Sequence, residues 1–175
     1  MKKIFVGCSA YDTIDTKYFD EAKKVAELLV TKDLELVFGS YNKGLMGVMY
    51  HTFKEHNKSI TGICAKCFEK FYNSVDCNRK LVDTTYEQLI EFSLSDIILY
   101  LPGGYGTFNE LFYLINSYAL REIDGKIIIY NMHHYFDNVI GILDKIKSEK
   151  FASIFDFVTI VDNVDDLNKV LEKIC

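Results

Sequence analysis

The sequence is short of several features, and each shortage excludes a class of protein. No apolar run among its 175 residues is long enough to span a bilayer. The net charge of −5 leaves no basic surface for a general nucleic-acid interface. The five cysteines are an odd number in a chain large enough to fold without disulfides, so we expect reduced thiols. We therefore expect a cytoplasmic protein with neither a membrane nor a nucleic-acid partner.

The common metal and nucleotide motifs are missing as well. Cys64 and Cys67 have C-x-x-C spacing, but no second pair and no nearby histidine accompany them, so we expect no metal. The first apolar run is not followed by G-x-G-x-x-G, and segment 39–47 lacks the Gly-Lys-Ser/Thr of a P-loop. No lysine stands in a recognisable pyridoxal-binding context. These absences argue against dinucleotide enzymes, P-loop NTPases and lysine decarboxylases, and we expect no cofactor.

The only proline, Pro102, stands in the segment that says most about function. An apolar run at 97–101 precedes it, and an apolar-periodic stretch from Leu111 follows. Strand, glycine turn and helix in this order leave free backbone N–H groups at a helix N-terminus, where an anion can bind. Three of the ten glycines lie in this turn: Gly103, Gly104 and Gly106.

Thr107 and Glu110 in the same segment allow two interpretations. Thr107 can bond a phosphate oxygen, and a carboxylate beside an anion site points to chemistry, because it does not help to bind a phosphate. Alternatively, Thr107 caps the helix and Glu110, three residues on, completes a capping box. The spacing alone does not distinguish the two.

Apolar runs alternate with segments of helical period along the whole chain. The expected strands are 3–7, 34–38, 60–64, 97–101, 126–130 and 157–161. The expected helices are 18–31, 44–54, 84–95, 137–147, one after Thr107 and one from Asp165. Strands that are apolar on both faces indicate a parallel sheet covered by helices. We expect one domain, residues 1–175, with a doubly wound α/β fold and helices on both faces of the sheet.

Small or glycine-rich segments follow three of the expected strands. In doubly wound sheets, ligands bind beyond the carboxyl ends of the strands. We expect the three segments to build one crevice. They are Gly7 to Ser9, Gly39 and Ser40 with Gly44, and residues 103–107.

Two of these segments match a known signature. Residues 102–110 read Pro-Gly-Gly-Tyr-Gly-Thr-Phe-Asn-Glu and fit P-G-G-x-G-T-x-x-E. Gly44-Leu-Met-Gly47 fits the end of a G-G-x-x-x-G-L-M-G block, with Ser40 in place of a glycine, and Gly7-Cys8-Ser9 resembles a C-G-S-S turn. Over nearly its whole length the chain resembles the LOG family, long mislabelled as lysine decarboxylases.

This resemblance implies a Rossmann-like homodimer that binds a nucleoside 5′-monophosphate, such as AMP or a cytokinin ribotide. The implied reaction is hydrolysis of the N-glycosidic bond to free base and ribose 5-phosphate. Glu110 would be catalytic, stabilising positive charge at the anomeric carbon or orienting water. The implied substrate- and phosphate-binding residues are Gly103, Gly104, Tyr105, Gly106, Thr107, Gly7, Ser9, Gly39, Ser40, Gly44 and Met46.

One departure from the family concerns charge. Active members carry an Arg-Lys pair on the helix before the P-G-G strand, and Glu87 and Gln88 occupy those positions here. The only arginines are Arg79 and Arg121, and Arg79 begins an Arg-Lys pair eight residues too early, so it is a possible surrogate. Two functions remain open: a nucleotide N-glycosidase using Glu110, or a protein that binds or senses a nucleotide or another phosphorylated small molecule without hydrolysing it.

Overall fold

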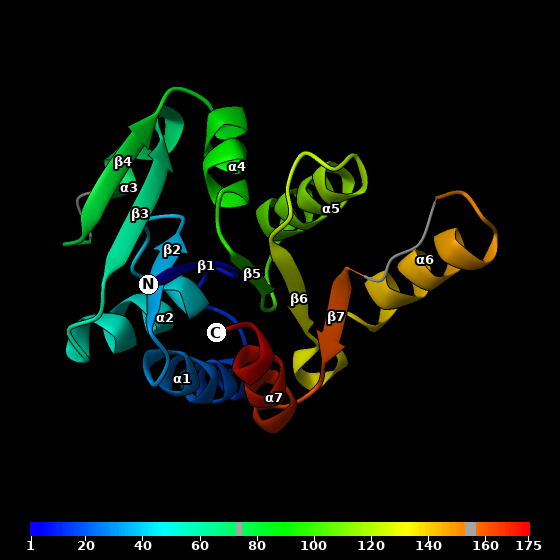
Figure 1. Cartoon of the computed structure of the whole chain (residues 1–175). Coiled ribbons are helices and arrows are strands. Elements are labelled where there is room, and N and C mark those ends of the chain that lie inside the picture. The colour runs from blue at the N-terminus through cyan, green and yellow to red at the C-terminus, as the bar shows by residue number, and fades with distance from the viewer. Residues whose placement is uncertain (73–74, 153–156) are drawn as a thin grey trace.

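A computed structural model describes residues 1–72, 75–152 and 157–175 and shows one seven-stranded sheet with the order β4-β3-β2-β1-β5-β6-β7 (Figure 1). Each strand pairs in parallel with its neighbours. The strands are β1 (Lys2–Gly7), β2 (Leu34–Phe38), β3 (Ile60–Ala65), β4 (Asn78–Val82), β5 (Ile97–Tyr100), β6 (Lys126–Tyr130) and β7 (Val158–Val161).

Helices cover both faces of this sheet, so the doubly wound α/β fold predicted from the sequence is confirmed. One face packs against α1 (Thr16–Val30), α2 (Gly44–Glu55) and α7 (Val164–Ile174). The other packs against α4 (Thr85–Ser93), α5 (Tyr105–Ala119) and α6 (Asp137–Ser148). Short helical segments follow β3 and β6: η1 (Lys66–Phe68), α3 (Glu69–Tyr72) and η2 (Met132–His134).

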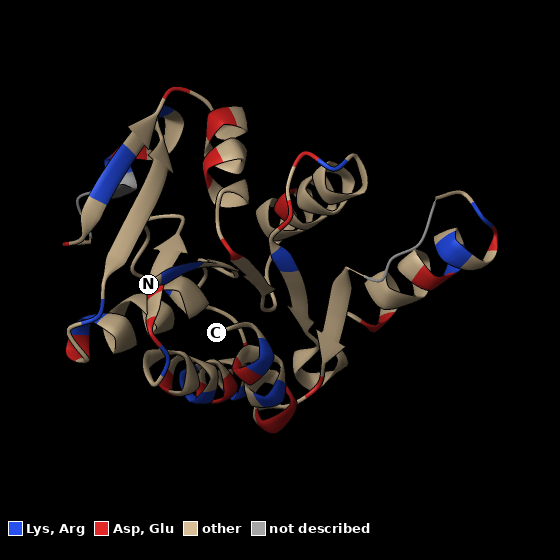
Figure 2. Ribbon diagram, viewed as in Figure 1, with Lys and Arg blue, Asp and Glu red and all other residues tan. Residues whose placement is uncertain are grey.

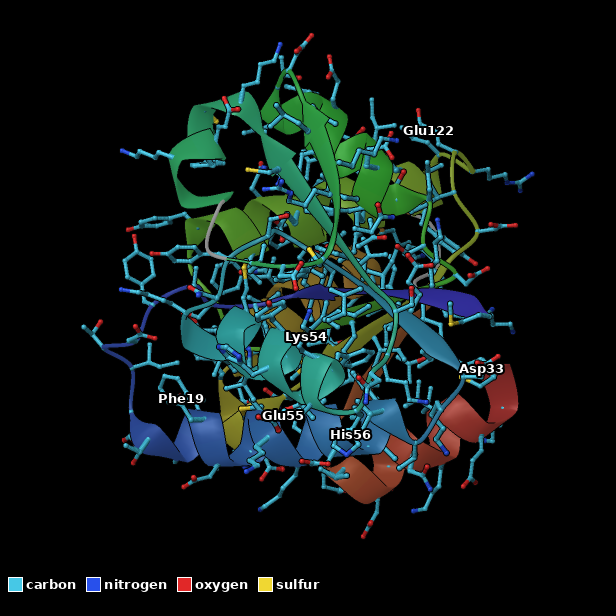
Figure 3. All side chains as sticks on the ribbon, turned by 90° about the vertical axis from the view of Figure 1, so that its left-hand side faces the viewer. Phe19, Asp33, Lys54, Glu55, His56 and Glu122 are labelled. Carbon is cyan, nitrogen blue, oxygen red and sulfur yellow. The ribbon has the colours of Figure 1, made fainter. Side chains whose placement is uncertain are left out.

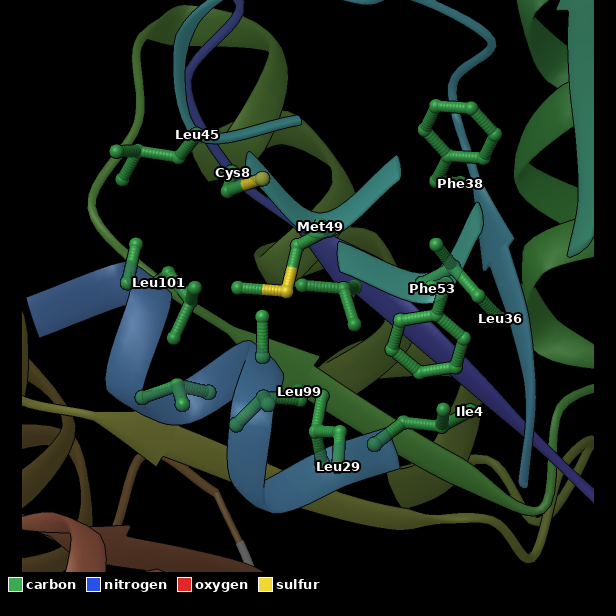
Figure 4. Packing of buried hydrophobic residues seen from close by; sticks show 14 of the residues in the cluster. Ile4, Cys8, Leu29, Leu36, Phe38, Leu45, Met49, Phe53, Leu99 and Leu101 are labelled. Atoms are coloured by element: carbon green, nitrogen blue, oxygen red, sulfur yellow. The ribbon is translucent and has the colours of Figure 1, made fainter. Parts of the chain in front are cut away.

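Successive residues of each central strand enter two different cores, as period-2 alternation requires. In β1, Ile4 and Val6 face the core under α1 and α2, whereas Phe5 faces the core under α5. Met49 of α2 is fully buried in the first core (Figure 4). Each such buried side chain contributes roughly 1.5–3 kcal/mol of transfer free energy. This burial holds the central strands in place.

The strand that the sequence did not predict is β4, and its burial pattern explains why. It lies at the edge of the sheet, and four of its five residues are exposed, with only Val82 buried. A strand of this kind shows no apolar run.

On the surface of the helices, acidic and basic residues are interspersed, as along α1 and α7 (Figure 2). Within the described ranges, no helix combines the length and the apolar character needed to cross a membrane.

Candidate functional site

The strand order reverses direction at β1, and the region at the carboxyl ends of β1 and β5 is here named the β1–β5 crevice, because ligands usually bind at this point of such sheets. From β1 the chain continues outward through β2, β3 and β4, and then returns to β5 on the other side of β1. The helices that follow these two strands, α1 and α5, pack on opposite faces of the sheet. Backbone bonds join the turns: Ser9 N–H donates to Pro102 O at 2.9 Å, and Leu101 N–H to Gly7 O at 3.0 Å.

In residues 102–107, here named the α5 turn, positions 104–106 are exposed, whereas Pro102, Gly103 and Thr107 are buried. The helix begins at Tyr105, and its N-cap, Gly104, supplies no side-chain hydrogen bond. A Cβ atom at Gly104 or Gly106 would have nothing within 4 Å, and Tyr105 is 96% exposed. A helix N-terminus that is neither capped nor covered is suited to bind an anion.

The capping-box interpretation of Thr107 and Glu110 is wrong. The helix starts two residues before Thr107, which therefore lies inside the first turn, while Glu110 lies one turn further on. The Thr107 side chain instead folds back on Gly103, where a Cβ atom would sit 2.0 Å from Thr107 Oγ1. This close approach explains the glycine at position 103.

Glu110 lies across the end of β1. A Cβ at Gly7 would lie 3.1 Å from the Glu110 Oε2 atom and 2.6 Å from Tyr100 Cε1, so a glycine at this position leaves room for both side chains. The residue is partly buried, and burial raises the pKa of its carboxyl to about 8. Burial, followed by the Glu110 charge, also raises the pKa of the Cys8 thiol and of the Tyr100 hydroxyl. Three titratable groups thus share the space behind the α5 turn.

The two residues at the family's Arg-Lys positions help to start α4 instead. Thr84 caps this helix, accepting a bond from Glu87 N–H at 3.1 Å, and the Glu87 carboxylate accepts one from Asp83 N–H at 2.8 Å. Gln88 is buried, and its Nε2 donates to Ile63 O at 2.8 Å. Both side chains therefore have structural partners.

Neither arginine approaches Glu110 within the chain. Arg79 pairs with Gly62 on the outer side of β3, three strands from β1, which is roughly 14 Å at the usual strand spacing. Arg121 follows the C-cap of α5 with a φ of 61°. The expected surrogate, Arg79, is thus separated from Glu110 in the single chain.

The segment before α2, residues 39–44, lies next to the crevice. The backbone N–H groups at the start of α2 already have acceptors within the protein. Gly44 has a φ of +60°, and its N–H donates to Asp12 Oδ1 at 2.7 Å. Met46 N–H donates to Ser9 O at 3.1 Å. Asp12 also forms an ion pair with Lys43. Sequence reasoning did not identify Asp12, because this cap comes from a residue distant in the sequence.

Ser40 and Met46 also point into the protein. Ser40 has a φ of 62° and is 1% exposed, and its Oγ has no partner among the described residues. A Cβ atom at Gly62 would be 2.4 Å from that oxygen. The Met46 Cε atom would lie 3.3 Å from a Cβ at Gly39. The three predicted segments therefore meet, but the α5 turn is the one that opens outward.

A hollow of about 330 Å³ lies between α1 and α2, and Asp12, Lys43 and Gly44 form part of its lining. Phe19 of α1 and Glu55 of α2, labelled in Figure 3, are among its lining residues. The α5 turn does not contribute to it. In the part of the chain that the structure describes, no group of three or more His, Cys, Asp or Glu side chains could hold a metal ion.

Comparison with known proteins assigns the chain to a family. The sequence profile of a family described as possible lysine decarboxylase matches residues 46–174, well over half of the chain. The chain belongs to this family. The matched range includes the whole α5 turn and Glu110.

Similar proteins within the family carry the LOG name. The chain is 28% identical over 155 residues to the Arabidopsis thaliana cytokinin riboside 5′-monophosphate phosphoribohydrolase LOG2, covering 87% of this chain and 73% of that protein. It is 27% identical over 174 residues to a probable enzyme of the same activity, LOGL1, from Oryza sativa subsp. japonica, covering 98% and 78%.

Solved structures show the same fold at lower identity. The molybdenum cofactor binding protein of Rippkaea orientalis superposes with a TM-score of 0.73 at 16% identity, covering 99% of this chain and 98% of that one. The Moco carrier protein of Chlamydomonas reinhardtii gives 0.74 at 13% identity, covering 99% and 96%. At this identity the likeness concerns the fold alone.

Proposed function

We propose that this protein binds a nucleoside 5′-monophosphate in the β1–β5 crevice and hydrolyses its N-glycosidic bond. The observation that carries the proposal is the position of Glu110, beside Gly7 and directly behind the open α5 turn. A phosphate held by the backbone N–H groups of that turn leaves the ribose near the carboxyl. The names of the similar plant enzymes support the same substrate class.

In this reaction water adds to C1′ of the ribose while the bond from C1′ to the base nitrogen breaks. The base leaves with a proton, and ribose 5-phosphate remains. The transition state resembles an oxocarbenium ion, which the Glu110 carboxylate stabilises in its ionised form. Because burial raises the pKa of Glu110 to about 8, the rate of base release should increase as the pH rises toward and beyond that value.

The test is chromatography of free base after incubation of the purified protein with AMP and a panel of other nucleoside monophosphates. Glu110→Gln should lower release by about a thousandfold or more, since it removes the charge that stabilises the transition state. Glu122→Gln, the same change at an exposed position, should leave it unaltered (Figure 3). Absence of release from every substrate in the panel contradicts the proposal.

A second function, ligand binding without hydrolysis, is favoured by one observation. Glu87 and Gln88 serve the start of α4, and the two arginines of the chain lie away from Glu110. Without a cation, the carboxyl stays largely protonated at neutral pH. Heat of AMP binding in calorimetry, with no base released, would select this sensing or carrier role over the enzyme.

We also propose that the protein is a homodimer, with α4 and α5 at the interface. Tyr86 and Ile90 of α4 and its C-cap residue Leu94 follow one another at four-residue intervals and are 70%, 48% and 67% exposed. Phe112 of α5 is also exposed, and Tyr86 contacts Tyr113 of α5 edge-on. Such an apolar stripe is suited to a second copy.

Light scattering tests this dimer. Leu94→Glu should convert it to a monomer, because a charge would be buried at the interface, whereas Ile142→Glu on exposed α6 should not. A wild-type protein that is monomeric at all concentrations overturns the dimer.

A further inference from the structure

Tyr100 at the end of β5 carries a hydroxyl that the fold does not explain. The residue is fully buried, and its oxygen has no hydrogen-bond partner among the residues that the structure describes. Its ring packs edge-on against Phe5, with centroids 6.0 Å apart. Phenylalanine would pack in the same way without burying an unpaired hydroxyl, which is unfavourable. The hydroxyl therefore needs a reason other than packing.

The neighbour of this ring is the Glu110 carboxyl. A Cβ atom at Gly7 would lie 2.6 Å from Tyr100 Cε1 and 3.1 Å from Glu110 Oε2, so both side chains press on the same point of β1. Cε1 is the ring carbon next to the one that bears the hydroxyl. Within the described ranges no side-chain hydrogen bond to the Glu110 carboxyl is found, and burial alone shifts its pKa. An unpaired donor and an unpaired acceptor thus lie side by side.

Another buried tyrosine shows how the chain satisfies such a group elsewhere. Tyr130 at the end of β6 is also fully buried, and its hydroxyl donates to the Glu21 carboxylate. Lys24 bonds the same carboxylate at 3.0 Å. Both bonds lower the pKa of Glu21, so this glutamate is ionised and paired with its tyrosine.

Among the described residues, no cation lowers the pKa of Glu110 in this way. The titratable groups that sense its charge are the Cys8 thiol, from the turn after β1, and the Tyr100 hydroxyl, from β5. Burial and that charge raise the pKa of both, so both are neutral at physiological pH. Of the two, the hydroxyl is the stronger hydrogen-bond donor.

We propose that Tyr100 is a positioning residue for Glu110: its hydroxyl donates a hydrogen bond to the Glu110 carboxylate when this group ionises in the crevice. The bond fixes the carboxylate behind the α5 turn and stabilises its charged form. This inference rests on the proposed function, because it assigns Tyr100 a role through the carboxyl that the hydrolysis requires.

The test is the pKa of Glu110 in the ligand-free full-length protein, followed by ¹³C NMR of the glutamate carboxyl signals and assigned with Glu110→Gln. Tyr100→Phe, which keeps the ring, should raise that pKa by about one unit, a tenfold lower ionisation constant. Tyr130→Phe, the matched change beside Glu21, should leave it unchanged. A Glu110 pKa within about 0.3 unit of wild type in Tyr100→Phe overturns the proposal.

Further measurements separate this proposal from the proposed function. If no nucleoside monophosphate is hydrolysed but Tyr100→Phe still raises the pKa, the positioning role stands and the hydrolase fails. If base is released and Tyr100→Phe alters only the KM for AMP, the hydroxyl contacts the ligand and the proposal is overturned. Should Tyr100→Phe not fold, the wild-type Tyr100 Cζ signal must still titrate with the midpoint of Glu110, and a flat signal overturns the proposal.

Discussion

The turns before α2 and α5 look alike in sequence and differ in what their backbone N–H groups do. Each follows a buried strand, carries glycine and opens a helix at the same edge of the sheet. At α2 the N–H of Gly44 bonds Asp12, and that of Met46 bonds Ser9. At α5 the N-cap Gly104 makes no side-chain bond, and the space above it is open.

The difference shows that a glycine turn before a helix indicates close approach of another group to the backbone. The turn alone does not show whether that group belongs to the protein or to a ligand. At α2 the approaching group is the protein's own turn after β1. At α5 no protein group covers Gly104 or Gly106 in the described residues, so a ligand can. We therefore interpret the α2 turn as a structural contact with the turn after β1 and the α5 turn as the ligand-binding surface.

The largest effect should come from adding one methyl group to each turn. Gly44→Ala should destabilise the protein by about 4 kcal/mol, because the φ of +60° disfavours a side chain and its Cβ would lie 2.6 Å from Ser9 O. Gly106→Ala, inside α5 with open space around it, should stabilise by about 0.5–1 kcal/mol. Urea unfolding measures both, and equal losses would contradict the distinction.

The next effect concerns pH. The pKa of Glu110 is raised in the folded protein, to about 8 from an ordinary 4.5, so folding disfavours the ionised form. The stability that depends on this group is full below pH 4.5 and is lost as the pH rises to about 8. Glu110→Gln should therefore gain on the order of 3 kcal/mol relative to wild type between pH 5 and 8.5. A stability difference that does not change with pH argues against a buried carboxyl.

A smaller effect should follow the loss of the long-range cap. Asp12→Ala removes the acceptor of the Gly44 N–H and should lower the free energy of unfolding by about 1 kcal/mol. Binding of ribose 5-phosphate should change little, since the α5 turn is untouched. Strong loss of binding with unchanged stability would make Asp12 part of the ligand site instead.

A change of similar size and opposite sign is expected at Ser40. Ser40→Gly relieves a left-handed backbone and removes a buried hydroxyl without a partner in the described residues. We expect a gain of about 1 kcal/mol in urea unfolding. A loss would show that the hydroxyl has a stabilising partner in solution.

Much of this architecture could be predicted from the sequence, because apolar runs and glycine positions are local signals. The strands 34–38 and 126–130 have the predicted bounds, and the three small-residue segments meet as expected. The edge strand β4 could not be found, since its exposed side chains carry no apolar pattern. The role of Asp12 was hidden because its partner, Gly44, is distant along the chain.

The start of α5 shows a different limit. Thr107 and Glu110 have capping-box spacing, but the helix begins at Tyr105, and its N-cap position holds a glycine, which makes no side-chain hydrogen bond. The same spacing at Thr84 and Glu87 does mark a helix start, at α4. Local sequence could not separate the two, because the packing of α5 on β1 and β5 decides where its first turn lies.

The most direct test of the account is a ¹H–¹⁵N NMR titration of the wild-type protein with ribose 5-phosphate, which carries the phosphate and has no base to lose. The account predicts that the largest amide shifts fall on residues 104–107 of the α5 turn, while the amides of Gly44 and Met46 stay in place. Largest shifts at Gly44 and Met46, with residues 104–107 unmoved, would contradict it.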